Sequence, residues 1–127
     1  YVKTFTYAIN SSTAENQRIF LELGELSNIG EVWLNGQNLG VSWTKPHRFD
    51  VTKLIKPGEN LLEIEIANTW SNRLKGDAIT GKNFTNTNIQ STSINGLNKI
   101  KVPWKEVPLM GSGLKGPVKL IFLSTIK

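Results

Sequence analysis

The sequence has no cysteine and a single histidine. The lack of cysteine excludes disulfides, thiolate metal sites and catalysis by a cysteine nucleophile. A Ser-His-Asp triad would depend on His47 alone, and the sequence contains no Gly-x-Ser-x-Gly motif. The same scarcity argues against a transition-metal site built from histidines. What remains are functions that need neither thiols nor several imidazoles.

Long apolar runs and clustered charge are also missing. No run approaches the roughly 18–20 apolar residues that span a bilayer, and we expect no membrane partner. The net charge is +5, but the basic residues are spread along the chain and no aromatic RNA-binding motif accompanies them. We therefore expect no nucleic-acid partner. A length of 127 residues suits one domain with its own core.

Turn signals divide the chain into short strand-like runs. Asn35-Gly36 stands between Glu31–Leu34 and Gln37–Val41, which predicts a β-hairpin with a two-residue type I′ turn. Further strands are predicted over residues 2–9, 18–23, 46–51, 60–68 and 118–123, with a weak strand over 94–102. One helical turn is expected over 52–55. The polar tract from 76 to about 94 predicts a long surface loop. The pattern as a whole favours an all-β sandwich or barrel.

Two carboxylates alternate with buried-type residues in the run from 60 to 68. Glu63 and Glu65 share one face, and Leu62, Ile64 and Ile66 share the other. Glycoside hydrolysis uses a carboxylate pair that flanks the scissile bond. The alternation, however, places this pair on the solvent side of a strand. We therefore predict a wet strand surface here and no catalytic residues.

Sugar binding needs an aromatic face for the C–H bonds of the ring and planar hydrogen-bonding groups for the hydroxyls. Two short segments offer both, and we predict carbohydrate contacts from Trp43, His47, Arg48, Trp70, Asn72 and Arg73. Packing of the tryptophans in the core or at its rim is the alternative.

Oxygen ligands for calcium are available in the predicted loops, from Asp50, Asp77, Asn68 and Asn72. No Asp-x-Asp-x-Asp-Gly run is present. We expect no cofactor, with a structural calcium ion left as an open alternative.

Three segments resemble a known family: VWLNGQNLG at 32–40, RFDVTKLIKPGENLLEIEIANT at 48–69 and NRLKGD at 72–77. They are similar to the galactose-binding-domain-like sugar-binding module of glycoside hydrolases of family 2. With GSGLKGPVKL at 111–120, the chain looks closest to the C-terminal module of family 106 α-L-rhamnosidases. The resemblance implies a jelly-roll β-sandwich over residues 1–127, excised from a longer glycoside hydrolase that carries its catalytic acids in a separate barrel domain.

The resemblance also implies a role. It predicts a non-catalytic carbohydrate-binding or accessory module, partnered by carbohydrate and by the neighbouring catalytic domain of the same chain. A bacterial parent enzyme would place it in the periplasm or outside the cell. A purely structural domain packed against the barrel is the alternative, followed by an autonomous hydrolase. Within NRLKGD, we expect Arg73 and Asp77 to pair and to tie the polar loop to the sandwich.

Overall fold

The computed structural model describes residues 1–8, 17–89, 91–93 and 101–124. They divide into two compact units, the first comprising Tyr1–Asn68 and Ser112–Lys127 and the second Thr69–Gly111. The first unit contains most of the strands, and the second contains the α-helix. That residues 1–127 act together as one excised module stays a prediction.

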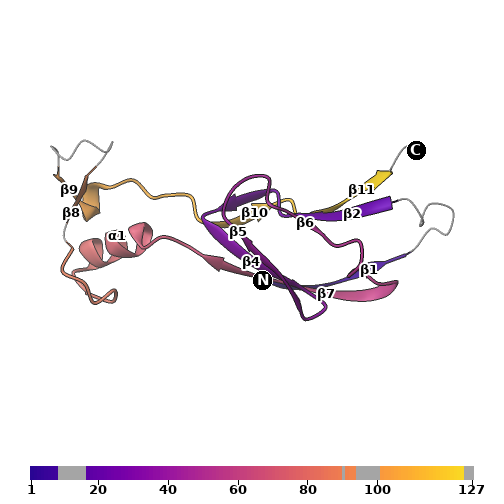
Figure 1. Ribbon diagram of the computed structural model, residues 1–127. Helices are drawn as coiled ribbons and strands as arrows, with labels where there is room; N and C mark the ends of the chain where they lie inside the picture. The colour runs from indigo at the N-terminus through magenta and orange to yellow at the C-terminus, as the bar shows by residue number, and fades with distance from the viewer. Residues whose placement is uncertain (9–16, 90, 94–100, 125–127) are drawn as a thin grey trace. The chain divides into compact units, whose positions relative to one another are not determined.

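The first unit is a β-sandwich of antiparallel sheets. Its strands are β1 (Val2–Tyr7), β2 (Gln17–Glu22), β3 (Glu25–Ser27), β4 (Ile29–Leu34), β5 (Gln37–Ser42), β6 (Arg48–Asp50), β7 (Gly58–Ala67), β10 (Gly113–Gly116) and β11 (Lys119–Ser124). One layer has the strand order β1-β7-β4-β5. The other layer is formed by β11-β2-β6 and the short pair β10-β3 (Figure 1). The predicted all-β sandwich is confirmed.

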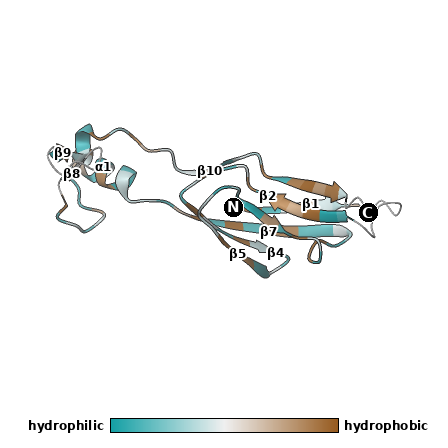
Figure 2. Ribbon diagram, turned by 45° about the horizontal axis from the view of Figure 1, so that its top comes forward, coloured by the Kyte–Doolittle hydropathy of each residue, from teal (hydrophilic) through white to brown (hydrophobic). Residues whose placement is uncertain are grey.

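Period-two alternation builds the core between the layers. Leu62 and Ile64 of β7 are buried, together with Leu21 of β2 and Val32 of β4. In Figure 2 the strands of the first unit carry much of its apolar colour. Because every second side chain points outward, the residues between these core positions form the two outer faces of the sandwich.

The predicted hairpin turn is present, and a polar network holds it. Asn35 and Gly36 have φ values of 53° and 80°, as a type I′ turn requires. Asn35 Nδ2 donates to Oδ1 of the fully buried Asn60 (2.9 Å) and to the carbonyl of Leu54 (3.1 Å). The network therefore joins the β4–β5 turn to the start of β7 and to the segment that precedes β7.

The helical turn predicted over residues 52–55 is also confirmed. The backbone N–H groups of Leu54 and Ile55 both donate to the carbonyl of Val51 at 2.9 Å. Asp50 Oδ1 accepts the backbone N–H of Thr52 at 3.0 Å, which fixes the start of the turn.

The second unit corrects the prediction of a continuous surface loop from 76 to about 94. Helix α1 (Ser71–Thr80) occupies its first part, and β8 (Ser91–Ser93) pairs with β9 (Lys101–Pro103) before the 3₁₀ turn η2 (Trp104–Glu106). Leu74 is the one buried residue of α1. The apolar pattern therefore gave no helical signal. The weak strand predicted over 94–102 lies outside the described residues up to position 100, and β9 covers its end.

No helix among the described residues is long and apolar enough to cross a membrane.

Candidate functional site

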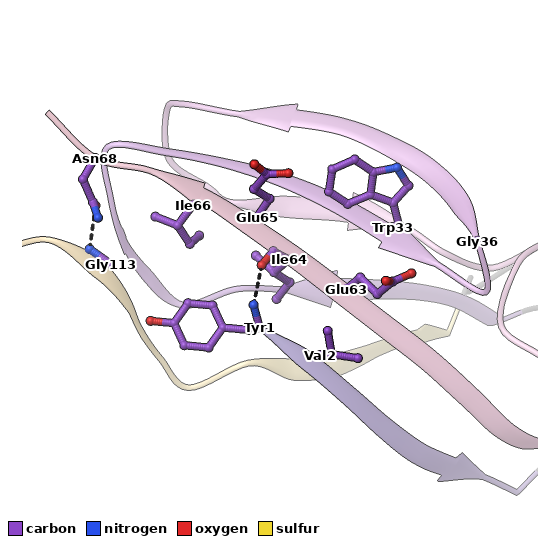
Figure 3. A pocket seen from close by; sticks show the side chains of 10 residues that line it. All are labelled: Tyr1, Val2, Trp33, Gly36, Glu63, Ile64, Glu65, Ile66, Asn68 and Gly113. Atoms are coloured by element: carbon purple, nitrogen blue, oxygen red, sulfur yellow. Dashed lines mark hydrogen bonds between the residues drawn. The ribbon is translucent and has the colours of Figure 1, made fainter.

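A hollow of about 690 Å³ lies over β7 in the first unit (Figure 3). Its walls come from β7, from the β4–β5 hairpin, from the start of β1 and from the start of β10. The lining residues are Tyr1, Val2, Trp33, Gly36, Glu63, Ile64, Glu65, Ile66, Asn68 and Gly113.

Strand register brings the key side chains of this hollow together. Trp33 of β4 and Val2 of β1 both pair with Glu63 of β7, on either side of it. Directly opposed residues have Cβ atoms about 4.5–5.5 Å apart, so the indole lies beside the carboxylate. Trp33 and Glu63 are half-buried, whereas Glu65 is exposed. An aromatic surface and two carboxylates therefore share one face of the sheet.

Two hydrogen bonds fix the side of the hollow that is formed by the starts of β1 and β10. The Tyr1 amino group donates to the carbonyl of Ile64 at 2.8 Å, and the N–H of Gly113 donates to Asn68 Oδ1 at 3.0 Å. Figure 3 shows both bonds below and beside β7. The Asn68 Oδ1 atom therefore accepts a hydrogen bond from Gly113, and this bond orients the Asn68 side chain at the end of the hollow.

Within the described part of the chain, the carboxylates of the hollow have no cationic partner. The ion pairs found among the described residues involve other acids, and neither Glu63 nor Glu65 takes part in one. Glu31 lies opposite Glu65 on the same face and accepts a hydrogen bond from Asn38 Nδ2 at 2.6 Å. The oxygens of Glu63 and Glu65 are therefore free to accept hydrogen bonds from a ligand.

The sequence indicates only part of this site. Strand alternation correctly predicts that Glu63 and Glu65 face away from the core, but Trp33 is not among the predicted site residues. The available signal was that Glu31 and Trp33 alternate with the buried residues Val32 and Leu34. Which strand they lie beside depends on cross-strand register, and alternation alone does not give that register.

The first predicted trio lies at the end of β5 and the start of β6. Trp43 is 73% exposed, whereas His47 is only 4% exposed and its Nδ1 lies 2.8 Å from Ser42 Oγ. Arg48 Nε donates to Glu22 Oε2 at 3.0 Å. His47 thus has a structural position inside the loop, and Trp43 is the freely accessible member of the trio.

The second predicted trio belongs to the second unit. Trp70 is 61% exposed and precedes α1. Asn72 Nδ2 donates to the carbonyl of Met110 and Asn72 Oδ1 accepts its N–H, each at 2.8 Å. The Arg73 guanidinium lies 5.0 Å from the centre of the Phe84 ring. Asn72 therefore anchors the 105–110 segment, and a sugar-binding role for this trio stays a prediction.

The expected pairing of Arg73 with Asp77 is wrong. Asp77 Oδ2 accepts the backbone N–H of Thr85 at 2.8 Å and also its hydroxyl, and these bonds lower the pKa of the Asp77 carboxyl. Arg73 contacts Phe84 instead. The two residues do hold the polar segment, but each through its own partner in that segment, because the helix directs both side chains towards it.

Metal ligation has little support in the part of the chain that the structure describes. No three His, Asp or Glu side chains converge there as a group that could hold an ion. A structural calcium ion stays an open alternative.

The antiparallel layers of the first unit define this chain as a β-sandwich module. The chain belongs to the glycosyl hydrolase 2 galactose-binding domain-like family, whose model matches residues 1–104. It is thus an accessory-type module of glycoside hydrolases, as the resemblance predicted.

Three similar proteins match over almost the whole chain. A putative β-glucuronidase of Formosa agariphila is 38% identical over 134 residues, which cover 94% of this chain and 11% of that protein. The structure of a rhamnosidase from Novosphingobium sp. PP1Y superposes with a TM-score of 0.71 at 34% identity, over 97% of this chain and 10% of that one. A β-glycosidase from Bacteroides vulgatus shares the fold, with a TM-score of 0.51, 24% identity and coverage of 96% and 12%. The chain therefore spans about a tenth of the length of these proteins.

Proposed function

We propose that this chain is a non-catalytic carbohydrate-binding module of a bacterial glycoside hydrolase, and that a sugar occupies the hollow over β7. The main support is one hollow of about 690 Å³ that combines Trp33 with Glu63 and Glu65, two acids without an ion-pair partner among the described residues. The indole offers an apolar face for the ring, and the carboxylates offer strong acceptors for its hydroxyls.

The module acts beside a catalytic domain of the same parent chain. Its relatives are about ten times longer than this chain and carry glycosidase names, which supports a separate catalytic region. We also propose a periplasmic or secreted location, which the resemblance implied. We expect the module itself to hydrolyse no aryl glycoside. Turnover that Glu63→Gln abolishes would instead favour an autonomous hydrolase.

A glycan array followed by titration calorimetry tests the binding function. The ligands are rhamnose, galactose and pectic oligosaccharides, each measured with and without calcium. Saturable binding that Trp33→Ala removes supports the proposal. Trp43→Ala, which deletes an exposed indole outside the hollow, tests separately the prediction that Trp43 contacts the sugar. If calcium changes the affinity, the open alternative of a structural ion gains support.

The second candidate function is docking against the catalytic domain. It is favoured by the exposure of Trp43 (73%) and Trp70 (61%), since large exposed aromatic side chains are typical of contact surfaces. If a folded chain binds no glycan, while Trp43→Ala or Trp70→Ala weakens its association with the parent catalytic domain, docking is the function.

A further inference from the structure

We infer that the hollow over β7 selects its sugar by charge: it prefers amino sugars to neutral sugars, and neutral sugars to uronic acids. This inference rests on the proposed function, because it concerns the ligand class of the same site. The inferred preference is opposite to the one expected from the overall charge, because a net charge of +5 by itself would attract acidic glycans.

The local charge of the hollow is negative. Glu63 and Glu65 line it, and Glu31 follows on the same face opposite Glu65. The backbone nitrogen of Tyr1 lies at the hollow and is bound to the carbonyl of Ile64. No arginine or lysine lines the hollow to receive the carboxylate of a uronic acid.

The position of Trp33 favours a cation in addition. Its indole lies next to the Glu63 carboxylate across the β4–β7 pair. An ammonium group within about 6 Å of an indole face is attracted by the ring, and the neighbouring carboxylate adds an ion pair. An amino sugar stacked on Trp33 would gain both contacts, whereas a uronic acid would meet like charge from Glu63 and Glu65.

The size of the effect follows from the exposure of these groups. Charge pairs at exposed sites contribute modestly, so two carboxylates change affinity by roughly fivefold to twentyfold between a neutral sugar and a uronic acid. The interaction is screened by salt because Glu65 is exposed. We therefore expect the discrimination to shrink at high ionic strength.

Two matched ligand series test the inference. One consists of β-1,4-linked oligomers of glucosamine, glucose and glucuronic acid. The other consists of galactosamine, galactose and galacturonic acid, so that ring configuration and charge are varied separately. Titration calorimetry at about 50 and 500 mM salt gives the order of affinities. The chain is measured with an acetylated amino terminus, so that an amine at Tyr1 adds no charge to the hollow.

Variants identify the source of the selectivity. The double variant Glu63→Gln/Glu65→Gln keeps the shape of the site and removes its charge, and we expect uronic acids to bind it as tightly as neutral sugars. Glu59→Gln removes the same kind of charge from β7 outside the hollow and should leave the order unchanged.

The inference is supported if amino sugars bind most tightly and uronic acids least tightly, and if only the double variant loses this order of affinities. A uronic acid that binds as tightly as its neutral counterpart overturns it while leaving the proposed binding function intact. An order that persists in the double variant also overturns it. A folded chain that binds no sugar of either series overturns both the inference and the proposed function.

Discussion

The two outer faces of the sandwich carry similar acidic side chains but hold them in opposite environments. On the face of the β11-β2-β6 sheet, Glu22 is paired with Arg48 and Asp50 with Arg18. Both guanidinium groups also lie over the Phe20 ring, at 5.1 Å for Arg18 and 5.9 Å for Arg48. Acids, cations and aromatic ring on this face therefore satisfy one another.

The face of the β1-β7-β4-β5 sheet also carries acidic side chains and an aromatic ring, but no cation is paired with Glu63 or Glu65 among the described residues. Trp33 takes the place of Phe20, and Glu63 and Glu65 have no ion-pair partner among the described residues. A face whose polar groups are already paired has little to offer a ligand, whereas unpaired acceptors beside an aromatic ring retain their binding capacity. The unpaired carboxylates and the indole together distinguish the candidate site from the opposite face.

The largest expected effect comes from breaking the polar network that sets the binding face. Asn60 is fully buried, and its Oδ1 accepts from Asn35 and from the N–H of Lys56, while its Nδ2 donates to the carbonyls of Lys56 and Gly58. Asn60→Ala leaves several buried groups without partners, and we expect it to lower the free energy of unfolding by roughly 2–4 kcal/mol.

Urea denaturation measures this loss, with Asn38→Ala as the control. Asn38 is an exposed asparagine of β5, and its removal should cost about 0.5 kcal/mol or less. A loss below that value for Asn60→Ala would show that the network does not hold the hairpin.

The next largest effect separates the two aromatic rings. Trp33→Ala should weaken sugar binding by about tenfold or more, because the stacking surface is lost. Phe20→Ala removes the ring of the opposite face and should leave the affinity unchanged. Calorimetry on both variants, after their melting temperatures have been compared, tests this. Equal losses in the two variants would remove the distinction between the faces.

The strands and turns of the fold were predictable because their signals are local. Asn35-Gly36 needs positive φ at both positions, and the alternation around Ile64 needs only a sheet with one buried face. Helix α1 was missed because polar side chains hold it. Asn72 binds Met110, and Lys75 Nζ donates to the carbonyl of Lys105 at 3.1 Å. Such contacts are long-range and leave no apolar period in the sequence.

The candidate site was predictable only in part for a similar reason. The outward orientation of Glu63 and Glu65 follows from strand alternation. Their neighbour Trp33 depends on register, and the pairing of the opposite face depends on which arginines lie across from Glu22. His47 has the right chemistry for a sugar contact, but its burial against Ser42 is a tertiary feature that residue type does not reveal.

A smaller effect concerns the pH dependence of the paired face. Hydrogen bonds from Thr52 and Arg18 lower the pKa of Asp50 to about 2. Because the folded-state pKa lies below the unfolded value, this stabilisation is present above about pH 4 and is lost as the pH falls towards 2. The side chain is 40% exposed, so solvent screening limits the contribution to about 1 kcal/mol.

Chemical denaturation at several pH values between 5 and 2 measures this contribution. Asp50→Asn should remove that part of the pH dependence, while the remaining carboxylates keep theirs. A variant with the same pH profile as the unchanged chain would show that Asp50 gains no stabilisation from its partners.

The smallest expected effect tests whether a carboxylate without an ion-pair partner is sufficient to create a sugar-binding face. Arg18→Gln removes the cation beside Asp50 and Phe20, and since the pair is 60% and 40% exposed, its loss should cost about 0.5 kcal/mol or less. Asp50 then carries a carboxylate without an ion-pair partner beside an aromatic ring. The hollow of about 520 Å³ beside Arg18 and Asp50 has no indole among its lining residues, so calorimetry should find one sugar site with unchanged affinity. A second site in this variant would mean that freeing an acid suffices, and that the ion pairs of this face exist to suppress binding there.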